Sequence, residues 1–522
     1  MSKIEKGKKA VKSISIMAVL ITLAKFLGLL REMLIASIYG QGYASDVINS
    51  ATQIPLLFFD MVLGVAILST FVPIFNRNLE KRGKEAAMHF ANNFITIVCS
   101  IALLAAILGS IFAEPIVRVM APGYAEVPGK IEETAKLLRI LFPSIAFTAT
   151  AYVVVGILQS FGEFTVPSLI SVVSNAIMIA YLLIFRDKLG LTGVAVSMLV
   201  GWAAQLFFQL PWLKKTGFKY RAVFDLRDGN VKDALKLAIP VLISSWVQPL
   251  CNVINMSFGS GLGDGAVSAL NWANKIYIIM VGIFAYAITN FIFPKLSRLS
   301  SGDNDEAFAE TTRMSVGWII FIIALVSALF LALSNPIISV VFERGSFTEE
   351  STAITGSALF FYSWGMVGYA ICEALNKSFY AIQDGKTPMY TSIFGVIVNI
   401  ACTAIFVVAL GIGIHGLALA SAISSNAIAA ALMIMINKRR PGIINLGFLA
   451  NILKILISGA AAFAVSKLIY VAIDPIFGSG TILTLVKLCI AAAPACVVYL
   501  ILSWILGVTE IKTAREKLLK RD

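Results

Sequence analysis

The sequence predicts an all-α, polytopic membrane protein with about 14 transmembrane helices. Of its 522 residues, 58% are hydrophobic and only 14% are charged. The mean hydropathy is +0.87, and soluble domains by comparison carry roughly 25% charged residues. Apolar runs long enough to cross a bilayer recur along the whole chain. Because helices satisfy their own backbone hydrogen bonds in lipid, these runs are predicted to be helices.

The runs expected to cross the membrane lie at 13–38, 45–76, 86–112, 134–160, 166–186, 191–213, 232–258, 267–297, 314–334, 351–382, 387–411, 414–437, 447–472 and 481–506. Basic clusters occupy alternate loops, at 76–84, 214–232, 295–313 and 437–440, and the tail at 510–522. Loops rich in Lys and Arg stay in the cytoplasm, so both termini are expected there. This pattern accounts for the net charge of +13, and no nucleic-acid partner is expected. The loop at 214–232 is expected to be a solvated linker.

The first twelve predicted helices read as two copies of one six-helix unit. Pro73 lies 221 residues before Pro294, and the same offset separates Pro167 from Pro388. Six is an even number, so both copies enter the membrane from the same side and the repeat is parallel.

The repeat predicts two pseudo-symmetric six-helix lobes and two added C-terminal helices. The lobes are expected at 1–222 and 223–440, and the added helices with a cytoplasmic tail at 441–522. Paired lobes of this kind usually form a central cavity and alternate its access by rocking.

Charged residues interrupt the first hydrophobic run. Lys25, Gly28 and the pair Arg31 and Glu32 share one helix face, and Lys25 falls near the middle of a ~30 Å bilayer core. An ionisable group costs about 2.5–3.5 kcal/mol at that depth, which favours a face turned to a watery cavity that binds an anionic substrate. In the alternative, Arg31 and Glu32 reach the far interface and Lys25 pairs with an acid.

The motifs of several function classes are missing from the sequence. The stretch at 384–387 imitates the end of a phosphate-binding loop, but Tyr380 replaces its first glycine. His89 and His415 are the only histidines and have no second ligand at metal spacing. No nucleophile lies beside a paired base. We therefore expect a transporter that is not an enzyme and that needs no metal or cofactor apart from a coupling Na+ or H+.

Several motifs resemble the MurJ/MviN family. They are VMAPGY at 119–124, LLRILFP at 137–143, FERGSFT at 342–348 and SFYAIQDGKTP at 378–388. The resemblance covers the first twelve predicted helices in order. It implies a bacterial inner-membrane flippase of the multidrug/oligosaccharidyl-lipid/polysaccharide exporter superfamily, acting on lipid II, the undecaprenyl-pyrophosphate-linked peptidoglycan precursor. It also implies that the last two helices form a groove for the lipid tail.

The resemblance assigns a purpose to the charged residues. The family's cavity typically has arginines on helices 1, 2 and 8. Arg31 retains the helix-1 arginine, and Gly28 retains the family's neighbouring glycine. Lys25 stands at another arginine position and Lys275 at the helix-8 position, although Lys275 is also explained as a helix-end lysine that reaches the interface. Phe59 replaces the helix-2 arginine. An anion site is retained, and strict lipid II specificity stays open.

Four further charges have two interpretations each. Glu32 stands for the family's usual aspartate, or serves only to neutralise a neighbouring cation. Asp46 matches the acid at the start of helix 2, or caps that helix. Glu373 is placed to take part in ion coupling, or to pair with Lys377 four residues later. Arg344 meets the head group, or is a loop charge.

Together these observations predict alternating-access flipping of lipid II, driven by the membrane potential or an ion gradient. Moving one charge across 100 mV is worth ~2.3 kcal/mol. The rivals are a flippase for another undecaprenyl-linked glycan, a cation-coupled multidrug exporter and a membrane-embedded polyprenyl-phosphate transferase. A non-transporting assembly scaffold is a further alternative. Membrane lipids are the expected surroundings, and the internal pseudo-dimer makes a monomer sufficient.

Overall fold

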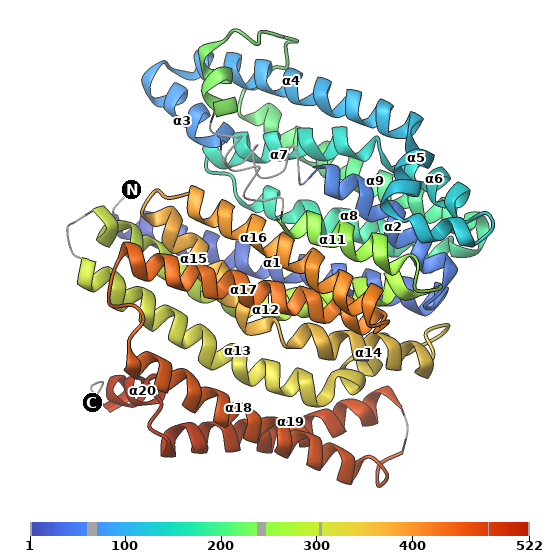
Figure 1. Cartoon of the computed structure of the whole chain (residues 1–522). Coiled ribbons are helices and arrows are strands. Elements are labelled where there is room, and N and C mark those ends of the chain that lie inside the picture. The colour runs from blue at the N-terminus through green and yellow to red at the C-terminus, as the bar shows by residue number, and fades with distance from the viewer. Residues whose placement is uncertain (1–2, 60–69, 237–246, 302–304, 479, 520–522) are drawn as a thin grey trace. The chain divides into compact units, whose positions relative to one another are not determined.

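Every regular element in the described part of the chain is a helix. The computed structural model describes residues 3–59, 70–236, 247–301, 305–478 and 480–519 (Figure 1). Within these ranges, ten helices are long and apolar enough to cross a membrane, and a bent helix pair provides an eleventh candidate. The all-helical prediction is confirmed.

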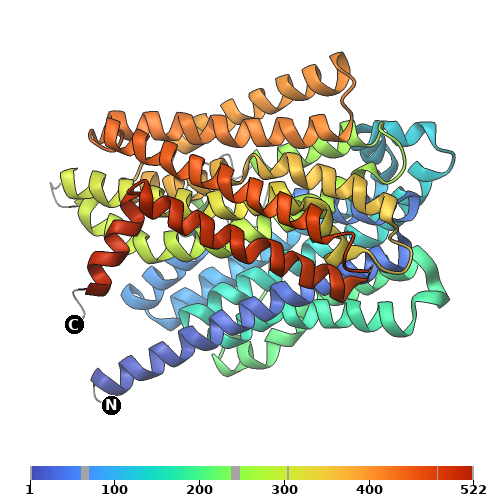
Figure 2. The ribbon, with the colours of Figure 1, turned by 90° about the horizontal axis from the view of Figure 1, so that it is seen from below.

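The count of about 14 spans stays a prediction. Eleven of the expected runs coincide with the ten helices and the bent pair. The first run, 13–38, lies inside a continuous helix, α1 (Lys3–Tyr39), which Figure 2 shows as one unbroken rod. The runs at 45–76 and 232–258 each include residues outside the described ranges.

The chain divides into two compact units, Met1–Gly265 and Ala266–Asp522. The boundaries expected from the internal repeat, after residues 222 and 440, remain predictions. The two added C-terminal helices lie within the second unit.

Unit 1 is a helical bundle in which α1 packs on α8 and α8 packs on α9. Besides α1, its described helices are α2 (Tyr43–Phe59), α3 (Val72–Lys81), α4 (Lys84–Ile111), α5 (Ala113–Met120), the 3-10 helix η3 (Pro122–Glu126), α6 (Lys130–Leu141), α7 (Ser144–Ser160), α8 (Thr165–Ile184), α9 (Arg186–Lys215) and α11 (Val247–Gly259).

A tight turn between α1 and α2 positions the first turn of α2. Gly40 follows the end of α1 with a φ of +65°, a left-handed conformation that glycine adopts without a Cβ clash. The backbone N–H of Gly42 then donates to the Ser45 hydroxyl at 3.0 Å. Asp46 therefore enters α2 within its first turn, where a carboxylate is favoured by the helix dipole.

The segment that follows α9 is exposed but is not a free linker. The side-chain amide of Asn92 on α4 donates to Lys219 O at 3.2 Å and accepts from Arg221 N at 2.9 Å. Asn93 makes the same paired contact with the backbone of Asp225, at 2.8 Å in each direction. The segment is therefore exposed, as expected of a solvated linker, and two asparagine side chains also hold its backbone against α4.

Unit 2 is a second helical bundle, organised around its long helix α13. Its helices are α12 (Ala266–Ser301), α13 (Asp305–Phe342), α14 (Glu349–Ser363), α15 (Met366–Ala381), α16 (Lys386–Thr403), the π-helix η4 (Ala404–Ala409), α17 (Ile414–Arg439), α18 (Leu446–Ile473), α19 (Thr481–Ile505) and α20 (Thr509–Leu519). Helices α14 and α15 form the bent pair, with an angle of 50° between them.

Helices α18 and α19 lie side by side, as Figures 1 and 2 both show, and both pack on α13. The buried Tyr499 hydroxyl on α19 donates to Phe321 O of α13 at 2.6 Å, which fixes the pair to the bundle. Their outer surface is apolar, with exposed Leu449, Leu468 and Val497. Such a surface suits contact with lipid chains.

Candidate functional site

Arg31 on α1 is held by two neighbours inside unit 1. Its Nη2 donates to Glu32 Oε1 at 2.5 Å, and its Nη1 donates to Asn175 Oδ1 on α8 at 3.1 Å. The Arg31 side chain is 20% exposed and the Glu32 side chain 7%. The guanidinium is therefore fixed in position but still reachable, which is the arrangement expected of a preorganised anion site.

Asn175 is the residue that orients this guanidinium, and sequence reasoning does not single it out as part of the site. Its Nδ2 donates to Ser171 O at 2.8 Å, which turns its Oδ1 toward Arg31. Gly28 faces the same amide, and a Cβ at that position would stand 3.8 Å from Asn175 Nδ2. Arg31 Nε is buried and has no hydrogen-bond partner in the described part of the chain.

The structure places the predicted α1 residues on one helix but in different surroundings. Lys25 is exposed, whereas Glu32 is buried beside Arg31. Arg31 and Glu32 form an ion pair with each other, and the alternative that both reach the far interface stays open. Glu32 reduces the net positive charge at Arg31 and holds its orientation.

Asp46 lies in a buried network that joins three segments of unit 1. It is 0% exposed, and its Oδ2 lies 3.0 Å from Lys130 Nζ at the start of α6. The same oxygen accepts from Gly265 N at 2.8 Å. Lys130 is 1% exposed and also pairs with Asp264 Oδ1 at 2.6 Å. One buried lysine thus bridges two carboxylates from segments far apart in the sequence.

Tyr124 of the APGY motif completes this network. Lys130 Nζ lies 4.3 Å from the centre of the Tyr124 ring, within the range of a cation–π contact. The Tyr124 hydroxyl lies 2.7 Å from Ser50 Oγ and donates to Asp46 O at 3.3 Å. Burial, together with the charge of Asp46, raises the pKa of Tyr124 well above its usual value. The hydroxyl therefore stays protonated and available as a donor.

Gly123 brings the APGY segment against the end of α11. Its N–H donates to Ser260 Oγ at 3.0 Å. A Cβ on Gly123 would overlap the backbone of Ser260 and Gly261. The motif is therefore a backbone packing site in unit 1, and sequence reasoning used it only as a family signature.

The candidate residues of unit 2 lie on separate helices. Lys275 is half-buried on α12, a helix that also carries the buried Trp272 and Ile276. Arg344 Nη2 donates to Val340 O at 2.5 Å and to Val341 O at 2.9 Å, so it caps the C-terminal end of α13.

The last two candidates of the sequence lie on α15 and α2. Glu373 and Lys377 lie one turn apart on α15 and attract each other electrostatically. Phe59 is the last residue of α2, and its side chain lies outside the described part of the structure.

Within the described ranges, no cluster of three or more His, Cys, Asp or Glu side chains is arranged to hold a metal ion.

Residues 35–488 match the sequence model of the family described as "Lipid II flippase MurJ". The chain belongs to this family. A probable lipid II flippase MurJ from Rhizobium tropici is 29% identical over 509 residues, which cover 95% of this chain and 94% of that protein. The corresponding protein of Bdellovibrio bacteriovorus is 25% identical over 515 residues, with 98% and 97% coverage.

Solved structures of other proteins match this chain in fold. The lipid II flippase MurJ in an inward closed conformation superposes with a TM-score of 0.78 at 24% identity, covering 94% of this chain and 98% of that one. An inward-facing multidrug MATE transporter of the MOP superfamily gives 0.68 at 18% identity, covering 82% and 98%. The resemblance seen in the sequence motifs is confirmed, and the MurJ family consists of multi-pass membrane transporters that are not enzymes.

Proposed function

We propose that the chain flips lipid II from the inner to the outer leaflet of the bacterial cytoplasmic membrane by alternating access. Support comes from the family match over residues 35–488 and from relatives, named as probable lipid II flippases, that align over nearly their whole length. The observation that carries the proposal is the fixed, reachable guanidinium of Arg31 on the first helix.

The chemistry of Arg31 suits a pyrophosphate. A guanidinium offers paired donors that match phosphate oxygens, and one already held in place loses little conformational entropy on binding. Glu32 lowers the net charge beside it, so binding is weak enough to be reversed, as release on the far side requires. In this proposal Lys25 and Lys275 add compact positive charges that replace part of the hydration of the pyrophosphate.

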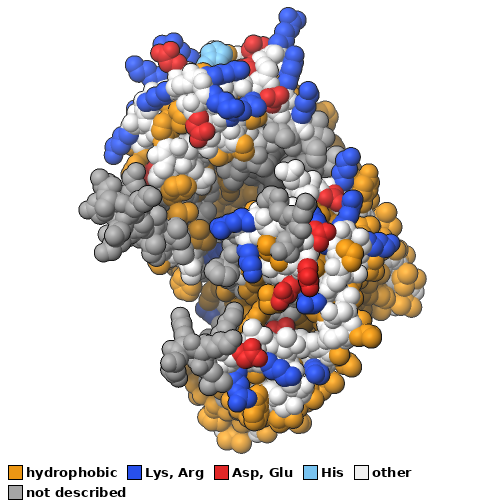
Figure 3. Space-filling model, turned by 90° about the vertical axis from the view of Figure 1, so that its left-hand side faces the viewer, with side chains coloured by type: hydrophobic (Ala, Val, Ile, Leu, Met, Phe, Trp, Pro, Cys, Tyr) orange, Lys and Arg blue, Asp and Glu red, His pale blue; other side chains and the backbone are white. Residues whose placement is uncertain are grey.

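The energy source in this proposal is the membrane potential or a gradient of Na+ or H+. Glu373, inside a helix of unit 2 and next to Lys377, is the proposed coupling group. Both termini are proposed to be cytoplasmic. Figure 3 supports this orientation for unit 1, since Lys and Arg side chains crowd the end of the unit that carries α3 and the start of α4. A monomer is proposed to be sufficient.

A flippase for another undecaprenyl-linked glycan is the second candidate. Phe59 stands where the family's helix-2 arginine is expected, so the site has one cation fewer to offer a pyrophosphate. An undecaprenyl-linked glycan with a different charge distribution near its lipid phosphate would depend less on that arginine for binding.

The deciding experiment measures lipid II in the outer leaflet of bacteria depleted of their own flippase. The chain is supplied as the only candidate activity, beside Arg31→Ala and the control Arg118→Ala, whose side chain is exposed and pairs with Glu114 on α5. We expect the chain and the control to restore lipid II exposure and growth, and Arg31→Ala to fail although it reaches the membrane. Full activity of Arg31→Ala refutes the cationic site. Failure of all three at normal membrane levels shows that lipid II is the wrong cargo.

A further inference from the structure

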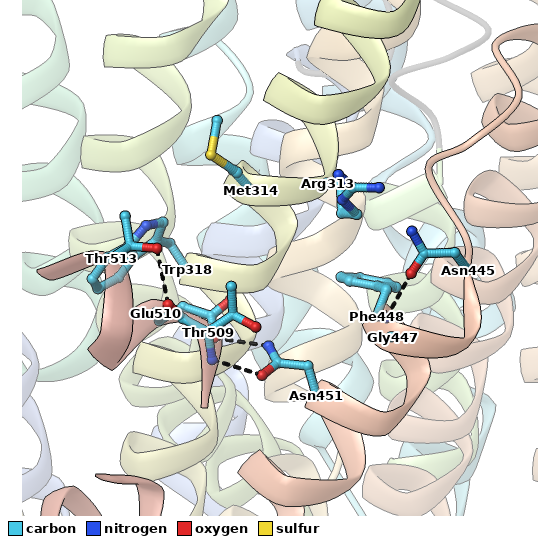
Figure 4. A pocket seen from close by; sticks show the side chains of 10 residues that line it. All are labelled: Arg313, Met314, Trp318, Asn445, Gly447, Phe448, Asn451, Thr509, Glu510 and Thr513. Carbon is cyan, nitrogen blue, oxygen red and sulfur yellow. Dashed lines mark hydrogen bonds between the residues drawn. The ribbon is translucent and has the colours of Figure 1, made fainter. Parts of the chain in front are cut away.

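A second polar site lies in unit 2, where α13, α18 and α20 meet. It is a pocket with a volume of about 160 Å³ (Figure 4). The residues that line it include Arg313 and Trp318 from α13 and Glu510 from α20. Asn451 of α18 and Asn445, which directly precedes α18, also line it. None of these residues belongs to the charged face of α1 or to the Asp46 network.

The carboxylate of Glu510 lies on one side of this pocket without a positive partner. Glu510 is 5% exposed, and its Oε2 accepts from Asn451 Nδ2 at 2.8 Å. Asn451 is itself fixed, because its Oδ1 accepts from Thr509 N at 2.9 Å. Among the described residues, no Lys, Arg or His lies within ion-pair distance of Glu510. A buried carboxylate without a cation is costly, so the site is suited to a positively charged ligand.

The opposite side of the pocket is positive. Figure 4 shows Arg313 across the pocket from Glu510. Arg313 Nη1 donates to Gly442 O at 3.0 Å, and the residue makes no ion pair in the described part of the chain. Asn445 caps α18 by accepting from Phe448 N at 2.7 Å, which directs the N-terminus of this 28-residue helix toward the same region. A guanidinium and a helix N-terminus together favour a phosphate.

The pocket also lies at the edge of an apolar surface. Trp318 and Met314 form part of its wall, and tryptophan prefers the boundary between lipid and water. Leu446, Leu449 and Leu453 are exposed along the first turns of α18, beginning beside the pocket. A ligand bound by its head in the pocket can therefore extend acyl chains along α18.

We propose that this pocket binds the head group of a zwitterionic phospholipid with a primary ammonium. The ammonium lies against Glu510, and the phosphate lies against Arg313 and the N-terminus of α18. A trimethylated ammonium has no N–H to donate to the carboxylate, and a glycerol head group has no positive charge. The bound lipid contacts α13, α18 and α20 together, so it stabilises the docking of α20 on unit 2.

The test uses the full-length chain, purified in detergent and titrated by native mass spectrometry. The probes are phosphatidylethanolamine, phosphatidylcholine, phosphatidylglycerol and free phosphoethanolamine. We expect phosphatidylethanolamine to be retained at least about tenfold more tightly than phosphatidylcholine, since a charge-assisted hydrogen bond separates them. Tighter binding of phosphatidylethanolamine than of phosphoethanolamine identifies a membrane lipid as the ligand, and equal binding identifies a soluble zwitterion.

Two variants and one control assign the contacts. Glu510→Gln should lose the preference for phosphatidylethanolamine but keep its binding of phosphatidylglycerol. Arg313→Gln, at a partly exposed position, should weaken both lipids, and Glu516→Gln on the exposed side of α20 should change neither. Equal retention of phosphatidylethanolamine and phosphatidylcholine by the unmodified chain overturns the proposal. If Glu510→Gln does not fold, unchanged phosphatidylethanolamine binding by Arg313→Gln overturns it equally.

Discussion

Replacement of Lys130 by Met should destabilise unit 1 strongly. Lys130 is 1% exposed and is the cation that neutralises the fully buried Asp46, at 3.0 Å. In Lys130→Met the Asp46 carboxylate keeps its hydrogen bond from Gly265 N but loses its ion pair with Lys130. Breaking a buried pair on one side costs about 3–5 kcal/mol, because the remaining charge stays uncompensated.

The other contacts of Lys130 add little to this figure. The Asp264 side chain is 46% exposed, so water replaces the lysine there and the loss is at most about 1 kcal/mol. Methionine retains the apolar contact with the Tyr124 ring, although the cation–π attraction is lost. The expected cost therefore remains about 3–5 kcal/mol, which is a large part of the stability of a typical domain.

The assay is thermal inactivation of the purified chain in detergent, compared with Lys136→Met. Lys136 lies on the same helix but is exposed, so its replacement should change stability by no more than about 0.5 kcal/mol. A double variant, Lys130→Met with Asp46→Asn, should be more stable than Lys130→Met alone, because it removes the uncompensated charge. A single variant as stable as the unmodified chain, or a double variant no better than the single, would refute the argument.

Two further predictions concern a glycine and an aspartate. Gly123→Ala should lower stability by about 1–3 kcal/mol, because its Cβ meets the backbone of Gly261, whereas Gly229→Ala enters open space and should be neutral in the same thermal assay. Asp384 is partly desolvated, which raises its pKa, but hydrogen bonds from the Thr387 side chain and backbone outweigh this and lower the pKa overall. A lowered folded-state pKa stabilises the fold above the unfolded value of about 3.9 and loses that contribution as the pH falls below it. Asp384→Asn should therefore be less stable than the parent at neutral pH, and the difference should shrink in acid; a constant difference from pH 7 to pH 3 would contradict the assignment.

The sequence by itself determined the class of the protein and one face of its proposed site. Hydrophobic runs of bilayer length predict helices, because in lipid a helix satisfies all of its backbone hydrogen bonds within one segment. The spacing of Lys25, Gly28 and Arg31 on one helix face follows directly from the helical period, and the structure finds Arg31 fixed beside Glu32. Local motifs were sufficient to indicate the family that the comparison then confirmed.

Only the tertiary structure decided which polar groups meet. Lys130 pairs with acids 84 and 134 residues away, and Glu510 lies 59 residues from the asparagine that orients it. Asn175 on α8 lies 144 residues after Arg31 on α1, and the sequence alone did not indicate that the two side chains are partners. Periodicity shows which side chains share a face of one helix, since that depends on local geometry alone. It does not show which two helices pack together, and the contacts across that packing give each buried charge its partner.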